Sequence, residues 1–416
     1  MNTVTEIASA ARDASRTLAS APTATKDAVL LDIADQIDTH ARDILSANAL
    51  DMQTARGAGL PAPKLRRLEL TEASISQLSR GVRQVAALTD PVGICTREYN
   101  TSPPANLHVR KVRIPLGVIA MIYEARPGVT VDAFSLCFKA GNACILKGGK
   151  EATHSNEALA AIVRRALQAH SLPDAACSVV SSLDREELKS LLELEGLIDL
   201  VIPRGGHDLI RFVAEHSRIP TIQHFQGVCH IFIDATADLE RALEVCVTAK
   251  TSAPATCNAA ECLLVHHAIA AAFVPKLGAA LIAAGVEMRG DPAIQSLATA
   301  ALAATDDDFG HEFLDLIYAA KVVSGVDEAI RHIQQYGSNH TEAILSETPA
   351  SIEKFIAGVG SSCVAINAST RFNDGFQLGL GAEIGISTSK LHAYGPMGLE
   401  ELTTQRFEVR GDYHTR

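Results

Sequence analysis

Cys257 is the residue whose surroundings best suit covalent chemistry in this 416-residue chain. Small polar residues and a proline precede it in the segment 252–258, and an apolar strand is expected to follow. Such a loop would leave the thiol open to a substrate. A thiolate attacks a carbonyl carbon well and leaves again once an aldehyde forms, while the N–H of Cys257 and neighbouring donors, among them Asn258, could hold the oxyanion. A buried structural cysteine is the alternative, and the residues alone leave both open.

Two further segments place polar groups at the ends of expected strands. Lys147 ends an apolar run and is followed by two glycines, a pattern that suits the ribose or phosphate of a nucleotide. Gly205 and Gly206 follow the expected strand 200–203 and open a helix, where backbone N–H groups can approach a phosphate. An exposed lysine in a turn and a plain strand-to-helix turn are the alternatives, and both stay open.

A charged pair closes the first apolar run of this region. Glu124 and Arg126 come directly after residues 118–123, which read as a buried strand. The pair indicates either a binding site or a buried salt bridge that fixes the loop, and the sequence does not choose between them.

The elements that must position these residues follow an α/β rhythm. Strands are expected at 118–123, 143–147, 177–181 and 200–203, alternating with helices at 131–139, 151–170, 185–195 and 208–216. This order predicts βαβ units on a parallel sheet, with ligands at the carboxyl ends of the strands. A second α/β region is expected from strands at 230–234, 262–266, 321–324, 343–346 and 363–367, with helices from 239, 268 and 327.

The two ends of the chain read differently. The first 90 residues are mostly helical in pattern, with apolar residues at helical spacing over 26–45 and a Gly/Pro break at 57–63. The tail from Phe372 is Gly-rich and then regular and polar. These regions predict packing and indicate little chemistry.

Composition excludes several classes of protein. A net charge of -11 argues against a general affinity for nucleic acid or anionic lipid, and 47% hydrophobic with 20% charged residues suits a globular enzyme. The first residues do not resemble a signal peptide, and the apolar stretch 268–286 reads as a buried helix, so a cytoplasmic protein is expected. The nine cysteines form no Cys-x-x-Cys pair, and we expect reduced thiols and no metal site.

Several segments together form a recognisable set. The longest are 367–372 (Asn-Ala-Ser-Thr-Arg-Phe), 381–392 and 395–402, and shorter ones lie at 114–119, 123–127, 141–143, 202–206, 227–230 and 256–258. In these segments, and over nearly its whole length, the chain resembles the gamma-glutamyl phosphate reductase family of the aldehyde dehydrogenase superfamily.

The resemblance implies an aldehyde-dehydrogenase-like α/β fold in three parts. A Rossmann-type NADPH-binding domain would cover 1–225, with about 98–115 contributing to a small oligomerisation flap. A catalytic domain would cover 226–370, and the segment 371–416 would return to the cofactor domain and the flap. A homo-oligomer with NADPH as hydride donor is expected.

The resemblance also assigns residues near the reaction centre. Cys257 falls at the position of the superfamily's nucleophile. Lys147 falls where a lysine contacts the adenosine ribose or its 2′-phosphate, and Glu312 falls near the glutamate that holds the nicotinamide ribose.

Four more residues are candidates for the substrate. Arg126 and Arg371 are expected to bind its anionic groups, because a guanidinium matches phosphate and carboxylate. Asn367 and Ser369 could position the amino-acid head of the substrate.

Some positions depart from the family pattern. Gly128 stands where Asn is usual, Arg66 where Asp is usual, and Tyr394 where Arg is usual. Oxidising aldehyde dehydrogenases need a carboxylate base that activates water for deacylation, and the resemblance places this base in the stretch 223–227. That stretch contains no acidic residue, which favours reduction of a thioester over its hydrolysis.

The resulting hypothesis is NADPH-dependent reduction of L-glutamyl 5-phosphate to L-glutamate 5-semialdehyde through a Cys257 thioester, the second step of proline biosynthesis. Two rivals stay open. One is an NAD(P)-dependent semialdehyde dehydrogenase that needs no phosphate. The other is a catalytically idle partner that binds glutamate 5-kinase and shields its labile product.

Overall fold

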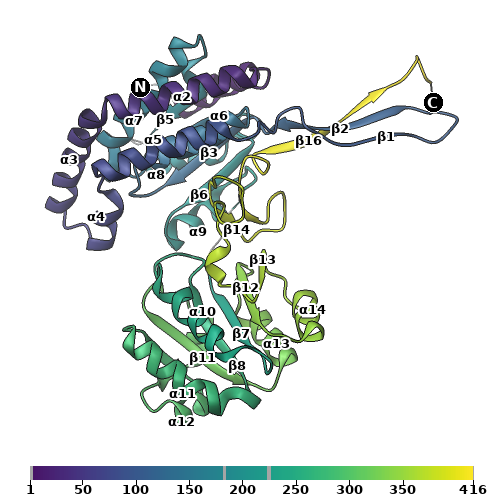
Figure 1. The fold of residues 1–416 in the computed structure, drawn as a ribbon. Coiled ribbons are helices and arrows are strands. Elements are labelled where there is room, and N and C mark those ends of the chain that lie inside the picture. Colours follow the sequence, from purple (N-terminus) through teal and green to yellow (C-terminus); the bar gives the residue numbers. More distant parts are fainter. Residues whose placement is uncertain (1–2, 181–183, 223–225, 416) are drawn as a thin grey trace. The chain divides into compact units, whose positions relative to one another are not determined.

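The computed structural model describes residues 3–180, 184–222 and 226–415 (Figure 1). The chain forms two compact units. The first unit comprises Met1–Gln223, Leu380–Gly385 and Met397–Arg416, and the second comprises His224–Gly379 and Ile386–Pro396. The tail beyond residue 370 therefore contributes to both units.

Helices make up the first part of the first unit. They are α1 (Val4–Leu18), α2 (Thr23–Thr39), α3 (Ala41–Gly57), α4 (Ala62–Leu68) and α5 (Glu72–Ala87). Capping boxes led by Thr3 and Thr71 begin α1 and α5, where each side chain accepts a hydrogen bond from an otherwise unpaired amide. The helical pattern at 26–45 is confirmed but divided, because His40 has φ −100° and ψ 19° and separates α2 from α3.

A parallel sheet forms the core of the first unit. Its strand order is β5-β4-β3-β6, and β3 is buried at all six positions because it lies inside the sheet. The register pairs Ile122 with both Lys147 and Pro203, so the ends of β3, β4 and β6 meet at one edge. The strands are β3 (Val118–Tyr123), β4 (Ala143–Lys147), β5 (Cys177–Val179) and β6 (Leu200–Arg204). The expected βαβ order is confirmed, while the end of the expected strand 177–181 lies outside the described residues.

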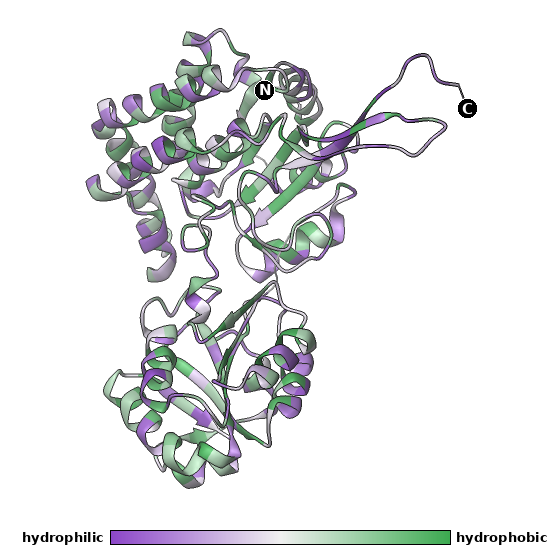
Figure 2. Ribbon diagram, turned by 45° about the vertical axis from the view of Figure 1, so that its right-hand side comes forward, coloured by the Kyte–Doolittle hydropathy of each residue, from purple (hydrophilic) through white to green (hydrophobic). Residues whose placement is uncertain are grey.

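Helices alternate with these strands. They are α6 (Val129–Lys139), α7 (Thr153–Ala169), α8 (Arg185–Leu192) and α9 (His207–His216), with short 3-10 turns η1 (Lys150–Ala152) and η2 (Asp174–Ala176). Figure 2 shows hydrophobic strands inside the sheets and hydrophilic residues on the outer faces of many helices. This division is what burial of apolar surface produces.

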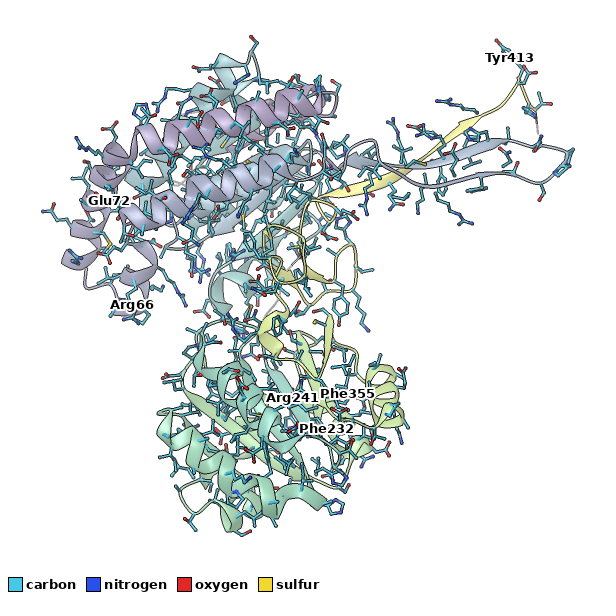
Figure 3. All side chains as sticks on the ribbon, viewed as in Figure 1. Arg66, Glu72, Phe232, Arg241, Phe355 and Tyr413 are labelled. Carbon is cyan, nitrogen blue, oxygen red and sulfur yellow. The ribbon has the colours of Figure 1, made fainter. Side chains whose placement is uncertain are left out.

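An antiparallel arm belongs to the first unit. Strands β1 (Cys95–Asn100), β2 (His108–Pro115) and β16 (Thr403–Arg410) pair in the order β1-β2-β16, so the tail lies beside residues about 300 positions earlier (Figure 1). Tyr413, near the end of the arm in Figure 3, is fully exposed. From its residues alone the tail was expected to be regular and polar, and the resemblance implied that it returns to the cofactor domain and the flap.

A larger parallel sheet organises the second unit. In the described residues its order is β10-β9-β11-β8-β7-β12-β13. The strands are β7 (Cys229–Ile233), β8 (Ala260–His266), β9 (Glu287–Gly290), β10 (Leu302–Ala303), β11 (Ile317–Val323), β12 (Thr341–Leu345) and β13 (Cys363–Ile366). The expected second α/β region is confirmed, and the short strands β9 and β10 were not anticipated.

Helices cover both faces of this sheet. One face packs on α10 (Leu239–Thr251), α11 (His267–Ala283) and α12 (Pro292–Leu297), and the other on α13 (Val326–Tyr336) and α14 (Pro349–Gly358). On the second face the rings of Phe232 and Phe355 stack with centroids 6.2 Å apart, and both are labelled in Figure 3. The smaller elements of this region are η3 (Asp306–Gly310), η4 (Thr370–Phe372), β14 (Ile386–Ser387) and β15 (Gly395–Pro396).

Among the described residues, none of the helices combines the length and apolar character that a membrane span requires.

Candidate active site

Cys257 lies in the loop between α10 and β8, and its side chain is partly exposed. Six of the nine cysteines are buried, whereas Cys257 is one of three that are not. A turn holds the loop, because the Thr256 hydroxyl donates to Ala253 O at 2.8 Å and the Ala259 amide donates to Thr256 O at 3.0 Å. The loop position that the sequence predicts for Cys257 is therefore observed.

The segments that precede three neighbouring strands meet at one edge of the second sheet. The strand order places β11, β8 and β7 side by side, and these strands are parallel. Gly227 precedes β7, Cys257 precedes β8 and Glu312 precedes β11. The nucleophile candidate thus lies at the amino ends of the strands.

Gly227 packs directly against the backbone of Cys257. A Cβ atom at Gly227 would lie 2.1 Å from Cys257 O, a distance that no real side chain can keep. The thiol of the buried Cys229 donates to the same carbonyl oxygen at 3.2 Å. The backbone of Cys257 is therefore held from two sides, which limits where its sulfur can lie.

Glu312 joins the same cluster through Gly227. Its half-buried carboxylate accepts a hydrogen bond from the Gly227 amide, which favours the charged form. Burial is the larger influence and raises the pKa of Glu312 above its ordinary value. A carboxylate expected to contact a cofactor ribose is thus tied to the backbone that contacts Cys257.

A β-bulge next to the site carries a buried ion pair. Cys229 pairs with Ala260 and His230 with Cys262, so Glu261 is an extra residue in β8. Lys250 Nζ lies 2.5 Å from Glu261 Oε2, with both side chains almost fully buried. Burial raises the pKa of Glu261 to about 7 against the opposing effect of Lys250, and burial lowers the pKa of Lys250.

Asn258 joins the loop of Cys257 to the segment after β13. Its side-chain amide donates to Asn373 O at 3.0 Å, and its Oδ1 accepts from the Thr256 hydroxyl at 3.0 Å. The Thr370 hydroxyl donates to Asn258 O at 2.8 Å. Both polar ends of this buried side chain therefore have partners within the chain.

Arg371 reaches the same loop. Its guanidinium donates to Thr256 Oγ1 at 2.8 Å and more weakly to Ser252 Oγ at 3.4 Å. Ser369 begins the short helix η4, since its hydroxyl accepts from the Arg371 amide at 3.3 Å. Two of the predicted substrate residues thus lie in the segment that packs against the nucleophile loop.

Asn367 lies at the opposite edge of the sheet. Its side chain accepts from the Ser346 amide at 2.8 Å and donates to Ser346 O at 3.0 Å. Ser346 directly follows β12 and Asn367 directly follows β13, whereas Cys257 precedes β8. The four-residue β13, about 13 Å long, therefore separates Asn367 from the amino-end cluster.

The other predicted binding residues belong to the first unit. Lys147 ends β4 and is half-buried, with Nζ 3.1 Å from Gly148 O. Burial lowers the pKa of this lysine below its ordinary value. Glu124, after β3, accepts a hydrogen bond from the Gly206 amide at 3.1 Å. The Gly206 amide, which was predicted to donate to a phosphate, therefore has a partner within the chain.

Gly205 and Arg126 complete this edge. A Cβ atom at Gly205 would lie 2.7 Å from the Leu209 side chain and 3.0 Å from the carboxyl group of Glu124, so these side chains would have to move to admit one. Arg126 follows β3 on the surface of the unit. The sheet register brings the ends of these strands together, as their sequence positions predict.

The three departures from the family pattern have different settings. Gly128 precedes α6 and has room for a Cβ atom, 3.8 Å from Leu78. Arg66 is exposed in the last turn of α4, as Figure 3 shows. The Tyr394 hydroxyl donates to Gly360 O. Residues 223–225 of the acid-free stretch lie outside the described residues.

Sequence reasoning missed three features of the site. The roles of Gly227 and Cys229 were not anticipated, although both belong to a matching segment at 227–230. The Lys250–Glu261 pair carried no signal, because neither a motif nor a period connects the two residues.

The chain is similar to known proteins over its whole length. The aldehyde dehydrogenase family model matches residues 1–305. A gamma-glutamyl phosphate reductase of Xanthomonas campestris pv. campestris is 52% identical over 100% of both chains. The crystal structure of gamma-glutamyl phosphate reductase from Thermotoga maritima has a TM-score of 0.97 at 41% identity, over 100% of both chains.

A more distant structure shares the fold alone. Glyceraldehyde-3-phosphate dehydrogenase GapN from Methanocaldococcus jannaschii, complexed with NADP, has a TM-score of 0.68 at 14% identity, over 98% of this chain and 94% of that one. Together, the family model, the full-length relatives and the fold show that this chain belongs to the aldehyde dehydrogenase family, whose members are oxidoreductases acting on aldehyde groups.

Proposed function

We propose that the chain reduces L-glutamyl 5-phosphate to L-glutamate 5-semialdehyde with NADPH and releases inorganic phosphate. This reaction is the second step of proline biosynthesis from glutamate, and we place it in the cytoplasm. The proposal is carried by the partly exposed Cys257, whose carbonyl is held by Gly227 and Cys229. Glu312 accepts a hydrogen bond from the same Gly227. The relatives' shared name, gamma-glutamyl phosphate reductase, supports the choice of substrate.

The chemistry starts at the sulfur of Cys257. Its thiolate attacks the acyl carbon, the carbon–oxygen bond to the phosphate breaks, and the phosphate leaves with the electron pair. NADPH, when bound, supplies a hydride to the thioester carbon. The tetrahedral oxyanion then expels the Cys257 thiolate and leaves the aldehyde. The Cys257 N–H is the candidate donor to this oxyanion.

Asn258 supports this chemistry by position. Both polar ends of its side chain are bonded within the chain, so we assign it the task of fixing the nucleophile loop on the segment 370–373. Its predicted role therefore becomes that of a positioning residue rather than an oxyanion donor.

Arg371 is the favoured anion partner of the substrate. Its guanidinium contacts Thr256, the residue before the nucleophile, and it keeps further N–H donors. A guanidinium fork matches either the phosphate or the carboxylate of the substrate. Arg126, Ser369 and Asn367 remain proposed substrate residues, and the contacts of Asn367 with Ser346 make it the weakest of them.

The first unit offers residues that fit a dinucleotide. The cation Lys147 at the end of β4 suits the adenosine ribose or its phosphate, and Gly205 and Gly206 open α9. Glu124 already accepts from Gly206, so a phosphate there would have to displace this carboxylate. In the second unit, Glu312 is the candidate for the nicotinamide ribose.

The arm supports association with further copies of the chain. Phe407 is 60% exposed and Val409 is 55% exposed on β16, and Tyr99 is exposed on the paired arm. Exposed apolar residues on a paired arm are typical of an interface. We propose a homo-oligomer through this arm, and sedimentation of a Phe407→Glu variant with a smaller mass than wild type would support it.

A phosphate-dependent reverse assay tests the function. Purified protein is given L-glutamate 5-semialdehyde and NADP⁺ with and without inorganic phosphate, and NADPH is measured by absorbance. The proposal requires NADPH formation that depends on phosphate. Formation without phosphate would favour the semialdehyde dehydrogenase, and no formation with fully folded protein would favour the idle partner of glutamate 5-kinase.

A further inference from the structure

Three buried side chains that the proposed reaction does not use converge in the second unit. His230 lies on β7, Cys262 on β8 and His332 on α13. Each offers one ligand atom, and these atoms all lie within 4.8 Å of one another. Two imidazoles and one thiol form a donor set that suits zinc or monovalent copper.

The fold itself brings the three residues together. His230 and Cys262 are direct partners in the parallel register of β7 and β8, so their side chains share a face. That face packs on α13, which supplies His332 with Nε2 3.7 Å from Cys262 Sγ. Tetrahedral coordination at ordinary Zn–S and Zn–N lengths separates such atoms by about 3.5 Å.

His230 has the orientation of a metal-bound histidine. Its Nδ1 lies 3.0 Å from Glu342 Oε2, and Glu342 is its direct partner on β12. Its Nε2 is completely buried and has no hydrogen-bond partner among the described residues. A carboxylate on one ring nitrogen with the other nitrogen left free is the arrangement found behind metal-binding histidines.

Aromatic rings surround His332. The His332 ring contacts Phe309 edge-on at 5.2 Å and Tyr336 at 4.7 Å. Burying a polar nitrogen without a partner is unfavourable, and a bound cation would remove that cost.

Coordination leaves the Nδ1 side of His230 facing Glu342 and uses Nε2 for the cation. Cys262 coordinates as a thiolate, so its proton, and any proton on His230 Nε2, goes to solvent. No electron is transferred.

We propose that His230, Cys262 and His332 form a structural site for one thiophilic d¹⁰ cation, Zn²⁺ or Cu⁺. Three ligands suit trigonal Cu⁺, or Zn²⁺ with one further small ligand. The cation would join β7 and β8 to α13. Because Gly227 and Cys257 directly precede these two strands, it would also stiffen the base of the nucleophile loop.

Metal stoichiometry tests the site on the full-length protein without a histidine tag. The protein is treated with EDTA and then given one equivalent of zinc sulfate, or of Cu⁺ under anaerobic conditions. After desalting, metal per chain is measured by inductively coupled plasma mass spectrometry. We expect one retained ion per chain in wild type, in Cys257→Ser and in Cys246→Ser, a buried thiol on the opposite face of the sheet.

The ligand variants should lose this ion. We expect less than a tenth of an equivalent in Cys262→Ser and in His332→Phe, in which the ring replaces the imidazole among Phe309 and Tyr336. Circular dichroism selects folded variants. If neither variant folds, Co²⁺ added to wild type decides, since a thiolate ligand gives a near-ultraviolet charge-transfer band. The proposal would be wrong if wild type retained neither ion, or if folded Cys262→Ser retained as much metal as wild type. Where neither variant folds, the absence of the Co²⁺ band in wild type would contradict it.

Discussion

The two parallel sheets of this protein use opposite edges for their candidate functional groups. In the first unit, Lys147 ends its strand and Arg126 and Gly205 follow theirs, at the carboxyl ends. In the second unit, Cys257 and Glu312 precede theirs, at the amino ends. The carboxyl-end rule for open α/β sheets therefore locates the first set and would miss the second.

The reason lies in what each edge offers. A strand followed by a helix presents backbone N–H groups at the start of the helix, which suits phosphate. The amino edge of the second unit instead brings together three short segments before β11, β8 and β7, and these fix a side-chain nucleophile through backbone contact. Binding and covalent chemistry thus have different structural needs in the same chain.

The largest effect should come from the nucleophile itself. Cys257→Ser should lower kcat by at least ~1,000-fold, because a hydroxyl is a far weaker nucleophile and a poorer leaving group at neutral pH. Steady-state reduction of NADP⁺ with phosphate measures it. Cys363→Ser, which alters another partly exposed thiol of the same unit, should keep wild-type activity. Normal turnover by Cys257→Ser would remove the amino-edge site from the comparison.

The next largest effect should distinguish the two glycine positions. Gly227→Ala should lower kcat by about 100-fold, because its Cβ atom must push the backbone of Cys257 and misplace the sulfur. Gly206→Ala, whose Cβ atom would lie 3.8 Å from Glu124, should change kcat less than about threefold. Equal losses in the two variants would mean that both edges respond alike to displacement, and the contrast between them would be lost.

Lys147 should show a smaller effect on binding. Lys147→Gln should raise the KM for NADPH by about tenfold and change kcat little, since one charge-assisted contact is lost in both ground and transition states. Initial rates against NADPH concentration measure this, with Lys64→Gln, an exposed lysine of α4, as control. A fall in kcat at unchanged KM would place Lys147 near the reaction rather than the ribose.

The smallest effect concerns stability in acid. Burial lowers the pKa of His332 to about 3. Below pH 6.5 this histidine is therefore protonated in the unfolded chain but stays neutral in the folded chain. Its contribution to stability is present above pH 6.5 and is lost as the pH falls toward 3, by up to about 1.4 kcal/mol per pH unit. Urea unfolding in EDTA should show a shallower acid slope in His332→Phe.

Wild type measured over the same pH range provides the contrast. If His332→Phe and wild type lose stability equally between pH 6.5 and 4, another group controls acid unfolding of the second unit.

Much of the fold was predictable from local pattern. The strands of both sheets other than β9 and β10, and most of their helices, were expected because apolar runs and helical periodicity depend on neighbours in sequence. The break at His40 was not expected, and local pattern did not predict the arm strands β1, β2 and β16, although the resemblance implied that about 98–115 and the tail contribute to a flap. A single residue can end a helix without changing its apolar pattern, and the arm buries only scattered residues such as Val109 and Val112, which give no regular alternation.

The sequence by itself determined the α/β rhythm, the family resemblance and the loop position of Cys257, because these follow from residue types over short segments. Only the tertiary structure decided that Gly227 packs on Cys257 O, that Glu261 forms a bulge paired with Lys250, and that Asn367 lies at the other edge. These contacts depend on strand order and register. Strand pairing is long-range, and no local period encodes which strands become neighbours.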